Sequence, residues 1–119
     1  MPMGTIRERM QLMLEVVNDL ERNLAGKNFE DFVANPDLTA AVERYLERIS
    51  AALGHVPQSI QIKHPNVDWQ GIVNIGNLLR HIYDRDLDRQ VWQVAKSNLP
   101  ELKRAVLATI REIDSSKSQ

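Results

Sequence analysis

Residues 5–26, TIRERMQLMLEVVNDLERNLAG, carry the pattern that decides the fold class. Thr5 and Glu8 have the spacing of a capping box, in which each side chain binds the other residue's backbone N–H at the start of a helix. Gly26 stands where a left-handed residue ends a helix. Between them, apolar residues recur at alternating spacings of four and three, the period of one helix face: Ile6, Met10, Met13, Val17, Leu20 and Leu24. The stretch therefore predicts an amphipathic helix that buries one side.

A second amphipathic helix is predicted over residues 38–53. Before it, residues 28–35 can form one short turn of helix. After it, Pro57 and Pro65 interrupt the chain because proline breaks a helix, and one helical turn is expected at residues 58–63. The apolar positions of the second helix keep helical spacing and end before Gly54: Leu38, Val42, Tyr45, Ile49 and Leu53.

Two more long helices follow in the second half of the chain. Asp68 can cap one that starts at Trp69 and reaches about Tyr83. Leu99 and Pro100 indicate that the chain restarts as a new helix, because proline is favoured in a first helical turn. The remaining apolar positions are Val91 and Trp92 in a shorter helix between them, and Leu102, Val106, Ile110 and Ile113 in the last one.

These segments predict an all-α fold, an up-and-down bundle of four main helices with short extra helical turns. No segment alternates between apolar and polar residues as a strand would. A chain of 119 residues suits one domain. We expect this single domain over residues 1–114 and a disordered tail over residues 115–119.

Composition excludes several function classes. The chain has no cysteine, which excludes a disulfide scaffold, a thiol nucleophile and every cysteine-based zinc site. Its 15 Lys and Arg against 16 Asp and Glu give a formal net charge of −1. Without a basic excess, any contact with RNA has to be local. No apolar run approaches the roughly 18 residues of a membrane span, and the start lacks a signal peptide's apolar core, so we expect a cytoplasmic protein with no membrane contact.

Neither a metal nor a cofactor is expected. His55 and His64 lie in the interrupted stretch and have no metal-ligand spacing with His81, so no three-ligand cluster forms. Gly71 and Gly76 lie within a helical stretch without the Lys and Ser/Thr that complete a phosphate-binding loop.

The helix that starts at Trp69 carries the residues best suited to chemistry. With 100° per residue, Asn74, Asn77 and His81 fall within about 60° of one another, and Arg85 joins them if the helix continues. Imidazole moves protons near neutral pH, and amides and guanidinium groups hold phosphate. The stripe is compatible with RNA cleavage by the ribose 2′-hydroxyl, and equally with a hydrogen-bonded interface between helices. The apolar positions fall mostly on another side: Ile72, Ile75, Leu79 and Ile82.

The order of short motifs along residues 6–113 resembles the HepT-like proteins of the HEPN superfamily, small all-helical toxins paired with a minimal nucleotidyltransferase antitoxin. The motifs that carry this resemblance are spread over the whole chain: Phe29, Phe32, Asn35, Pro36 and Asp37; Ala41, Val42, Leu46 and Ile49; Pro57, His64, Pro65 and Trp69; Val91 and Trp92; and Leu99, Pro100, Glu101 and Leu102.

The family's defining motif is an arginine, four residues, a histidine, one residue and a tyrosine. Its second half is present as His81 and Tyr83, and Asn77 and Leu79 occupy two family positions between the arginine and the histidine. Gly76 occupies the position of the arginine. Three further positions also depart from the family: Asn74 replaces a glycine, and Ser50 and Ala51 replace a common Gly–Glu pair.

The resemblance implies a homodimer that cleaves RNA without a metal ion, and an antitoxin of the MNT nucleotidyltransferase type that neutralises it. By position, His81 would be the catalytic acid/base and Asn77 a supporting residue. Tyr83 would be the residue that the antitoxin nucleotidylates, or a phosphate contact.

The missing arginine leaves the nuclease activity open. Losing one stabiliser of charge on phosphorus typically costs about 10²- to 10³-fold in rate, so a weakened ribonuclease is one interpretation. Arg80 is a possible substitute cation, although we expect it to lie well around the helix axis from position 76. A second interpretation is a non-enzymatic adaptor that binds a nucleotidyltransferase and presents Tyr83. A third is a structural dimer in which the polar stripe forms interface hydrogen bonds.

Overall fold

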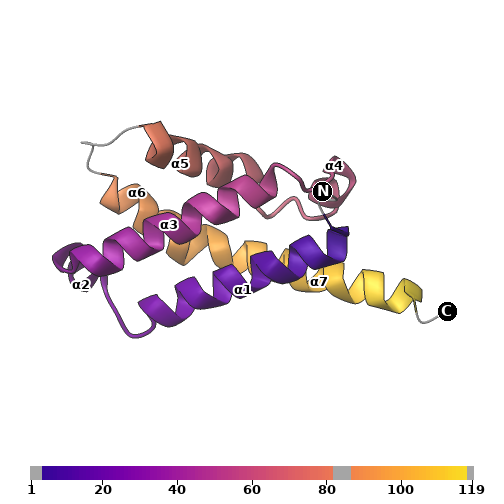
Figure 1. The fold of residues 1–119 in the computed structure, drawn as a ribbon, viewed down its shortest axis with the longest axis horizontal. Helices are drawn as coiled ribbons and strands as arrows, with labels where there is room; N and C mark the ends of the chain where they lie inside the picture. Colours follow the sequence, from indigo (N-terminus) through magenta and orange to yellow (C-terminus); the bar gives the residue numbers. More distant parts are fainter. Residues whose placement is uncertain (1–3, 82–86, 118–119) are drawn as a thin grey trace.

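The protein folds into helices only, over the residues that the structure describes (Figure 1). The computed structural model describes residues 4–81 and 87–117. Four long helical runs alternate in direction, so the predicted all-α bundle is confirmed. None of the described helices combines the length and the apolarity needed to cross a bilayer. The elements are α1 (Ile6–Leu24), α2 (Phe29–Ala34), α3 (Pro36–Leu53), α4 (Gln58–Lys63), α5 (Trp69–His81), α6 (Asp88–Gln93), the π-helical η1 (Val94–Asn98) and α7 (Leu99–Lys117).

Capping side chains define where the first helices begin. The Thr5 hydroxyl accepts from the backbone N–H of Glu8 at 3.1 Å, and the Glu8 carboxylate accepts from the N–H of Thr5 at 2.9 Å. Asn28 and Asp31 form the same reciprocal pair at the start of α2. Gly26, with φ of 74°, follows α1 in the left-handed region that favours glycine. The predicted capping box and the predicted end of the first helix are therefore confirmed.

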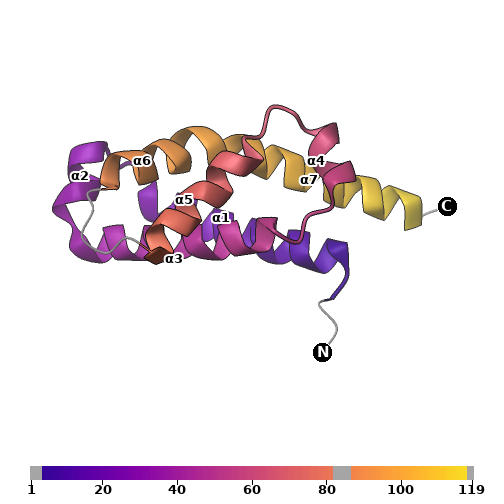
Figure 2. The same ribbon diagram turned by 90° about the horizontal axis from the view of Figure 1, so that it is seen from above.

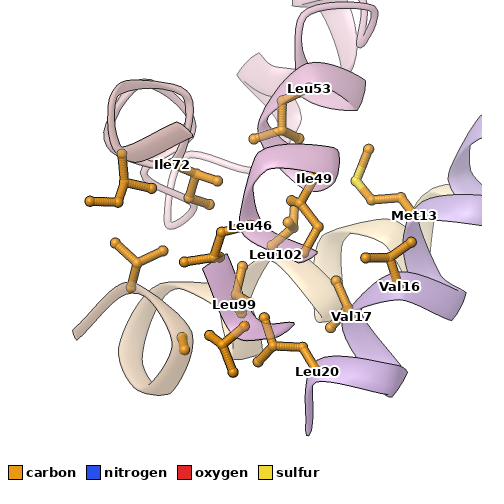
Figure 3. Close-up of a cluster of buried hydrophobic side chains, with 14 of the residues drawn as sticks. Met13, Val16, Val17, Leu20, Leu46, Ile49, Leu53, Ile72, Leu99 and Leu102 are labelled. Atoms are coloured by element: carbon orange, nitrogen blue, oxygen red, sulfur yellow. The ribbon is translucent and has the colours of Figure 1, made fainter. Parts of the chain in front are cut away.

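The core lies between α1, α3 and the run from α6 to α7, and α5 covers α3 from the other side (Figure 2). Figure 3 shows side chains from these helices pointing toward one another. The apolar stripes predicted for α1, α3 and α7 supply about half of the buried hydrophobic residues, and Ile6, the first residue of the predicted α1 stripe, is exposed. Residues of this core include Met13, Val17, Leu20, Leu46, Ile49, Ile72, Leu99 and Leu102.

The predicted start of a new helix at Leu99 and Pro100 is confirmed, because α7 begins at Leu99, but the chain does not leave the helical path before it. The elements α6, η1 and α7 follow one another without a gap from Asp88 to Lys117. Proline has no N–H to donate to the carbonyl one turn earlier. Here the preceding turn is π-helical, and the N–H of Leu99 bonds to the carbonyl of Val94, five residues back. A local widening of the helix thus accommodates the proline without ending the run.

The far end of this run extends into the stretch that the sequence placed in a tail. Ser115, Ser116 and Lys117 are the last residues of α7. One residue earlier, the Asp114 carboxylate accepts two hydrogen bonds from the Arg7 guanidinium, at 2.7 and 3.0 Å. This ion pair joins the start of α1 to the end of α7.

An aromatic cluster attaches α6 to α2. The Trp92 ring lies 5.5 Å from Phe32 and 6.0 Å from Phe29, centroid to centroid. Arg89 lies over the Phe29 ring at 4.7 Å, and Lys96 lies over the Trp92 ring at 5.0 Å. Cations at these distances are attracted to the ring faces. The cluster therefore holds two cations in place on the surface of α6 and η1.

Replacing Glu43 of α3 with glutamine is expected to stabilise the fold near neutral pH. Burial raises the pKa of Glu43, and the negative charges of Asp88 and Glu47 raise this pKa further. A raised pKa means that folding disfavours the ionised carboxylate, so stability is lost as pH rises through the folded-state pKa. Because solvent screens this partly exposed group, we expect a gain of a few tenths of a kcal/mol at pH 7.

Urea unfolding at pH 7 and at pH 4 checks this prediction. The gain should shrink at pH 4, where the glutamate is itself largely protonated. Glu15→Gln, at an exposed position of α1, is the matched control. A gain at pH 4 as large as that at pH 7 would contradict the electrostatic explanation.

Candidate functional site

Helix α5 presents the predicted polar stripe to solvent. Asn74, Asn77 and His81 are exposed, whereas Ile72 and Ile75 are buried against the rest of the bundle. The separation of apolar and polar faces is therefore as the sequence predicts, and the chemical roles of the stripe stay predictions. Two other candidates cannot be placed, because Tyr83 and Arg85 lie outside the described residues.

The position of the missing motif arginine is closed by α3. A Cβ atom added at Gly76 would lie 2.1 Å from Oγ and 2.2 Å from Cβ of Ser50. Ser50 is only 2% exposed, and its hydroxyl donates a hydrogen bond to the carbonyl of Val73 at 3.1 Å. The serine cannot move aside without losing this bond. Glycine at position 76 is thus required by the close approach of α5 to α3, rather than being a weak point of the helix.

Gly76→Ala is expected to destabilise the protein by about 1–3 kcal/mol, the usual cost of inserting a methyl group into a filled space. This loss should appear although alanine favours a helix by about 1 kcal/mol over glycine. Adding Ser50→Gly removes the obstructing atoms, so the double variant should lose less than the sum of the two single variants. Urea unfolding of all four chains gives the coupling energy.

Gly54→Ala provides the control for this cycle. Gly54 follows α3 with ordinary helical φ and ψ angles, and an added Cβ would meet only a backbone oxygen at 3.4 Å. We expect Gly54→Ala to change the free energy of unfolding only little. Strictly additive losses at positions 50 and 76 would show that the two residues do not compete for the same space.

Arg80 lies beside Gly76, which corrects the expectation that it faces elsewhere. Four residues at 100° each bring the two positions within about 40° of one another. The Nη1 atom of Arg80 lies 3.7 Å from the place of a Cβ at position 76. Its Nη2 atom donates a hydrogen bond to Oδ1 of Asn77. A guanidinium group therefore stands over the position from which the motif arginine would extend.

His81 follows directly as the last residue of α5 and is exposed. The described residues provide no hydrogen-bond partner for its ring, so both ring nitrogens are open to a ligand. Within the described part of the chain, Arg80 forms no ion pair and donates to the neutral amide of Asn77. An imidazole, which can transfer protons, and a guanidinium cation thus lie on consecutive residues. Within residues 4–81 and 87–117, no group of three or more His, Asp and Glu could hold a metal ion.

A comparison with models of protein families identifies the family to which this chain belongs. A family model described as "Ribonuclease HepT-like" matches residues 13–109. The chain belongs to the HepT-like family. The all-α bundle is the fold that the sequence resemblance implied, and His81 of the half-motif is the last residue of α5.

Named relatives of this HepT-like chain come from bacteria and archaea. A protein of Caldanaerobacter subterraneus subsp. tengcongensis, named as a putative RNase, is 34% identical over 87% of this chain and 93% of its own. A second protein named as a putative RNase, from Methanocaldococcus jannaschii, is 28% identical over 96% of this chain and 94% of its own. A "Probable ribonuclease HepT" of Thermococcus cleftensis is 29% identical over 76% of this chain and 79% of its own. No solved structure matches the chain significantly.

Two features of this HepT-like site could not be predicted from the sequence. Ser50 was noticed only as a departure from the family, and its contact with Gly76 links residues far apart in the chain. Gln90 and Gln93 were not singled out at all, yet they line a groove with Asn74 of the polar stripe. Nothing in their spacing signals this, because it depends on how α5 packs beside α6 and η1.

Proposed function

We propose that this HepT-like protein is an endoribonuclease that cleaves cytoplasmic RNA without a metal ion, with His81 as its proton-transfer residue. The observation that carries this proposal is the neighbouring pair of an exposed imidazole and a half-buried guanidinium at the end of α5, with the guanidinium bonded to Asn77. The family assignment and the names of the relatives support a ribonuclease.

The reaction follows from these groups. A neutral His81 takes the proton of a ribose 2′-hydroxyl, and the 2′-oxygen forms a bond to the adjacent phosphorus. The bond from phosphorus to the 5′-oxygen of the next nucleotide breaks, and this oxygen takes up a proton. The products are a 2′,3′-cyclic phosphate and a 5′-hydroxyl. Proton transfer by a positioned histidine typically contributes about 10²- to 10⁴-fold to such a rate.

In this proposal Arg80 replaces the motif arginine as the cation of the site. Negative charge develops on the non-bridging oxygens as the fifth bond to phosphorus forms, and a guanidinium can bind two of these oxygens. Asn77 positions the group by accepting its hydrogen bond. The cation comes from one turn further along α5, because position 76 has no room for a side chain.

The resemblance also supplies the assembly and the regulation that we propose. Two copies form a homodimer in which the two α5 ends face a shared cleft. A nucleotidyltransferase antitoxin of the MNT type neutralises the toxin by transferring a nucleotide to Tyr83, two residues after His81.

The closed position at Gly76 favours a second candidate, an adaptor without nuclease activity. In that case the protein binds a nucleotidyltransferase and presents Tyr83 for modification. Tyr83→Phe should then prevent nucleotidyl transfer while partner binding persists. Equal labelling of the two chains would exclude Tyr83 as the acceptor.

Cleavage of a mixed-sequence RNA in the presence of EDTA tests the nuclease. We expect activity that elutes with the protein in size-exclusion chromatography and leaves cyclic phosphate ends. The same oligonucleotide with 2′-deoxyribose throughout should resist cleavage, because the nucleophile is missing. Cleavage of that oligonucleotide, or dependence on a divalent metal, would overturn the mechanism. No cleavage of any RNA would leave the adaptor as the better explanation.

A further inference from the structure

A groove between α5 and the α6–η1 run lies next to the candidate site. Its volume is about 530 Å³, and its lining combines two kinds of side chain. The apolar ones are Ile75, Leu78 and Val94, and Leu78 is 39% exposed although it is a large hydrophobic residue. The polar ones are the three amides Asn74, Gln90 and Gln93. No carboxylate is among the described residues of the lining.

The three amides keep hydrogen-bonding groups for a ligand. Asn74 uses Oδ1 to accept from Gln70 at 2.9 Å, which leaves its NH₂ group. Gln93 uses Nε2 to donate to Ser97 at 3.2 Å, which leaves its carbonyl oxygen. The Gln90 side chain bonds to no other described residue. The groove therefore offers uncharged donors and acceptors between apolar walls, together with the positive charge of Arg89.

We propose that this groove binds one unpaired base of the RNA substrate, next to the bond that is cleaved. A nucleobase has flat apolar faces, which fit the aliphatic walls, and an edge of donors and acceptors, which amide side chains read in pairs. A protein segment would fit the apolar walls, but it does not require three amides in the lining. The proposal rests on the proposed nuclease, since it assigns a part of the same substrate to a second place on α5.

The helix geometry connects the groove to His81. Seven residues separate Asn74 from His81, which places them on nearly the same side of α5 and about 10 Å apart along its axis. A di- or trinucleotide spans this distance. A base held in the groove therefore places a nearby phosphate at the imidazole and the guanidinium.

Arg89 extends the same surface. It lines this groove and also a second hollow of about 350 Å³ beside Phe29, whose ring holds its guanidinium at 4.7 Å. A cation fixed between two hollows suits a phosphate of a strand that continues past the bound base. At this place Arg89 provides local positive charge for an RNA contact, in a chain whose formal net charge is −1.

Binding of single-stranded RNA tests the proposal independently of cleavage. A His81→Ala chain, in EDTA, is titrated into fluorescent oligonucleotides that carry one abasic nucleotide at successive positions, and anisotropy gives the affinities. We expect one position at which losing the base weakens binding about tenfold, within the range known for amide–base pairs. Adding Asn74→Leu, Gln90→Met and Gln93→Met, which keep the size of each side chain, should remove this sensitivity.

Gln58→Met is the matched control, because Gln58 is an exposed amide on α4 at the opposite end of the molecule from α6 (Figure 1). It should keep the sensitive position. Equal sensitivity of the triple variant and its parent would overturn the proposal, and so would RNA binding with no sensitive position, or no RNA binding at all. A triple variant whose dimer dissociates in ultracentrifugation, with RNA binding unchanged, would assign the groove to a second copy instead.

The outcomes separate this inference from the nuclease. Base-sensitive binding by the His81→Ala chain without cleavage by the natural chain would support the groove and reject the enzyme. Cleavage by the natural chain, with no base-sensitive position, would support the enzyme and reject the groove.

Discussion

RNA cleavage is expected to fall by about 10²- to 10⁴-fold when His81 is replaced by alanine, the contribution typical of one positioned proton-transfer group. The fold should persist, because His81 is exposed at the last residue of α5 and packs into no core. Single-turnover cleavage in EDTA measures the rate, and urea unfolding verifies the stability. A large loss of rate at constant stability would identify the imidazole as a catalytic group.

His55→Ala is the matched control for this experiment. His55 is also an exposed histidine, but it lies between α3 and α4, outside the polar stripe of α5. We expect it to cleave RNA at the natural rate. If the two variants cleave equally fast, His81 is not the proton mover. If the natural chain and both variants give the same weak cleavage, the activity belongs to a contaminant.

Arg80→Ala is expected to slow cleavage by about 10²- to 10³-fold, as removal of one charge-stabilising donor does in other enzymes. Arg80→Lys should recover only part of the rate, since an ammonium keeps the charge but not the planar pair of donors. Asn77→Ala should cost less than Arg80→Ala, because it frees the guanidinium without removing it. Rates at saturating RNA separate this effect from weaker binding.

Arg111→Ala controls for the general loss of a positive charge. Arg111 is exposed on α7 and forms no ion pair or side-chain hydrogen bond with the described residues. A slowdown there comparable to that of Arg80→Ala would point to long-range attraction of RNA rather than to a cation at the phosphate. Full activity of Arg80→Ala would mean that another group, such as one from a second copy, supplies the charge.

The sequence predicts the features of this fold that depend on neighbours along the chain. The capping box of Thr5 and Glu8 and the single turn between two prolines at residues 58–63 are local signals, and the structure reproduces both. Leu99 and Pro100 correctly predict where α7 begins, but they do not show that the preceding helix continues into α7 without a gap. Whether a proline ends a helix depends on how the preceding turn can rearrange, and the π-helical turn at residues 94–98 is held by packing that no local pattern shows.

The candidate site also combines features that local sequence predicts with features that depend on tertiary packing. The helical repeat is enough to place Asn77 and His81 on one face. The state of position 76 depends on Ser50, a residue of another helix, so glycine there could only be interpreted as a loss from the motif. The groove amides Gln90 and Gln93 lie beyond the turn after α5, and their approach to Asn74 follows from tertiary packing alone.

The contact between Ser50 and Gly76 also limits how this surface can be engineered. Serine at position 50 and any side chain at position 76 overlap, so an arginine introduced at position 76 alone has no room. A variant that carries a side chain at position 76 therefore needs a smaller residue at position 50 as well, and Ser50→Gly is the change that removes the overlapping atoms.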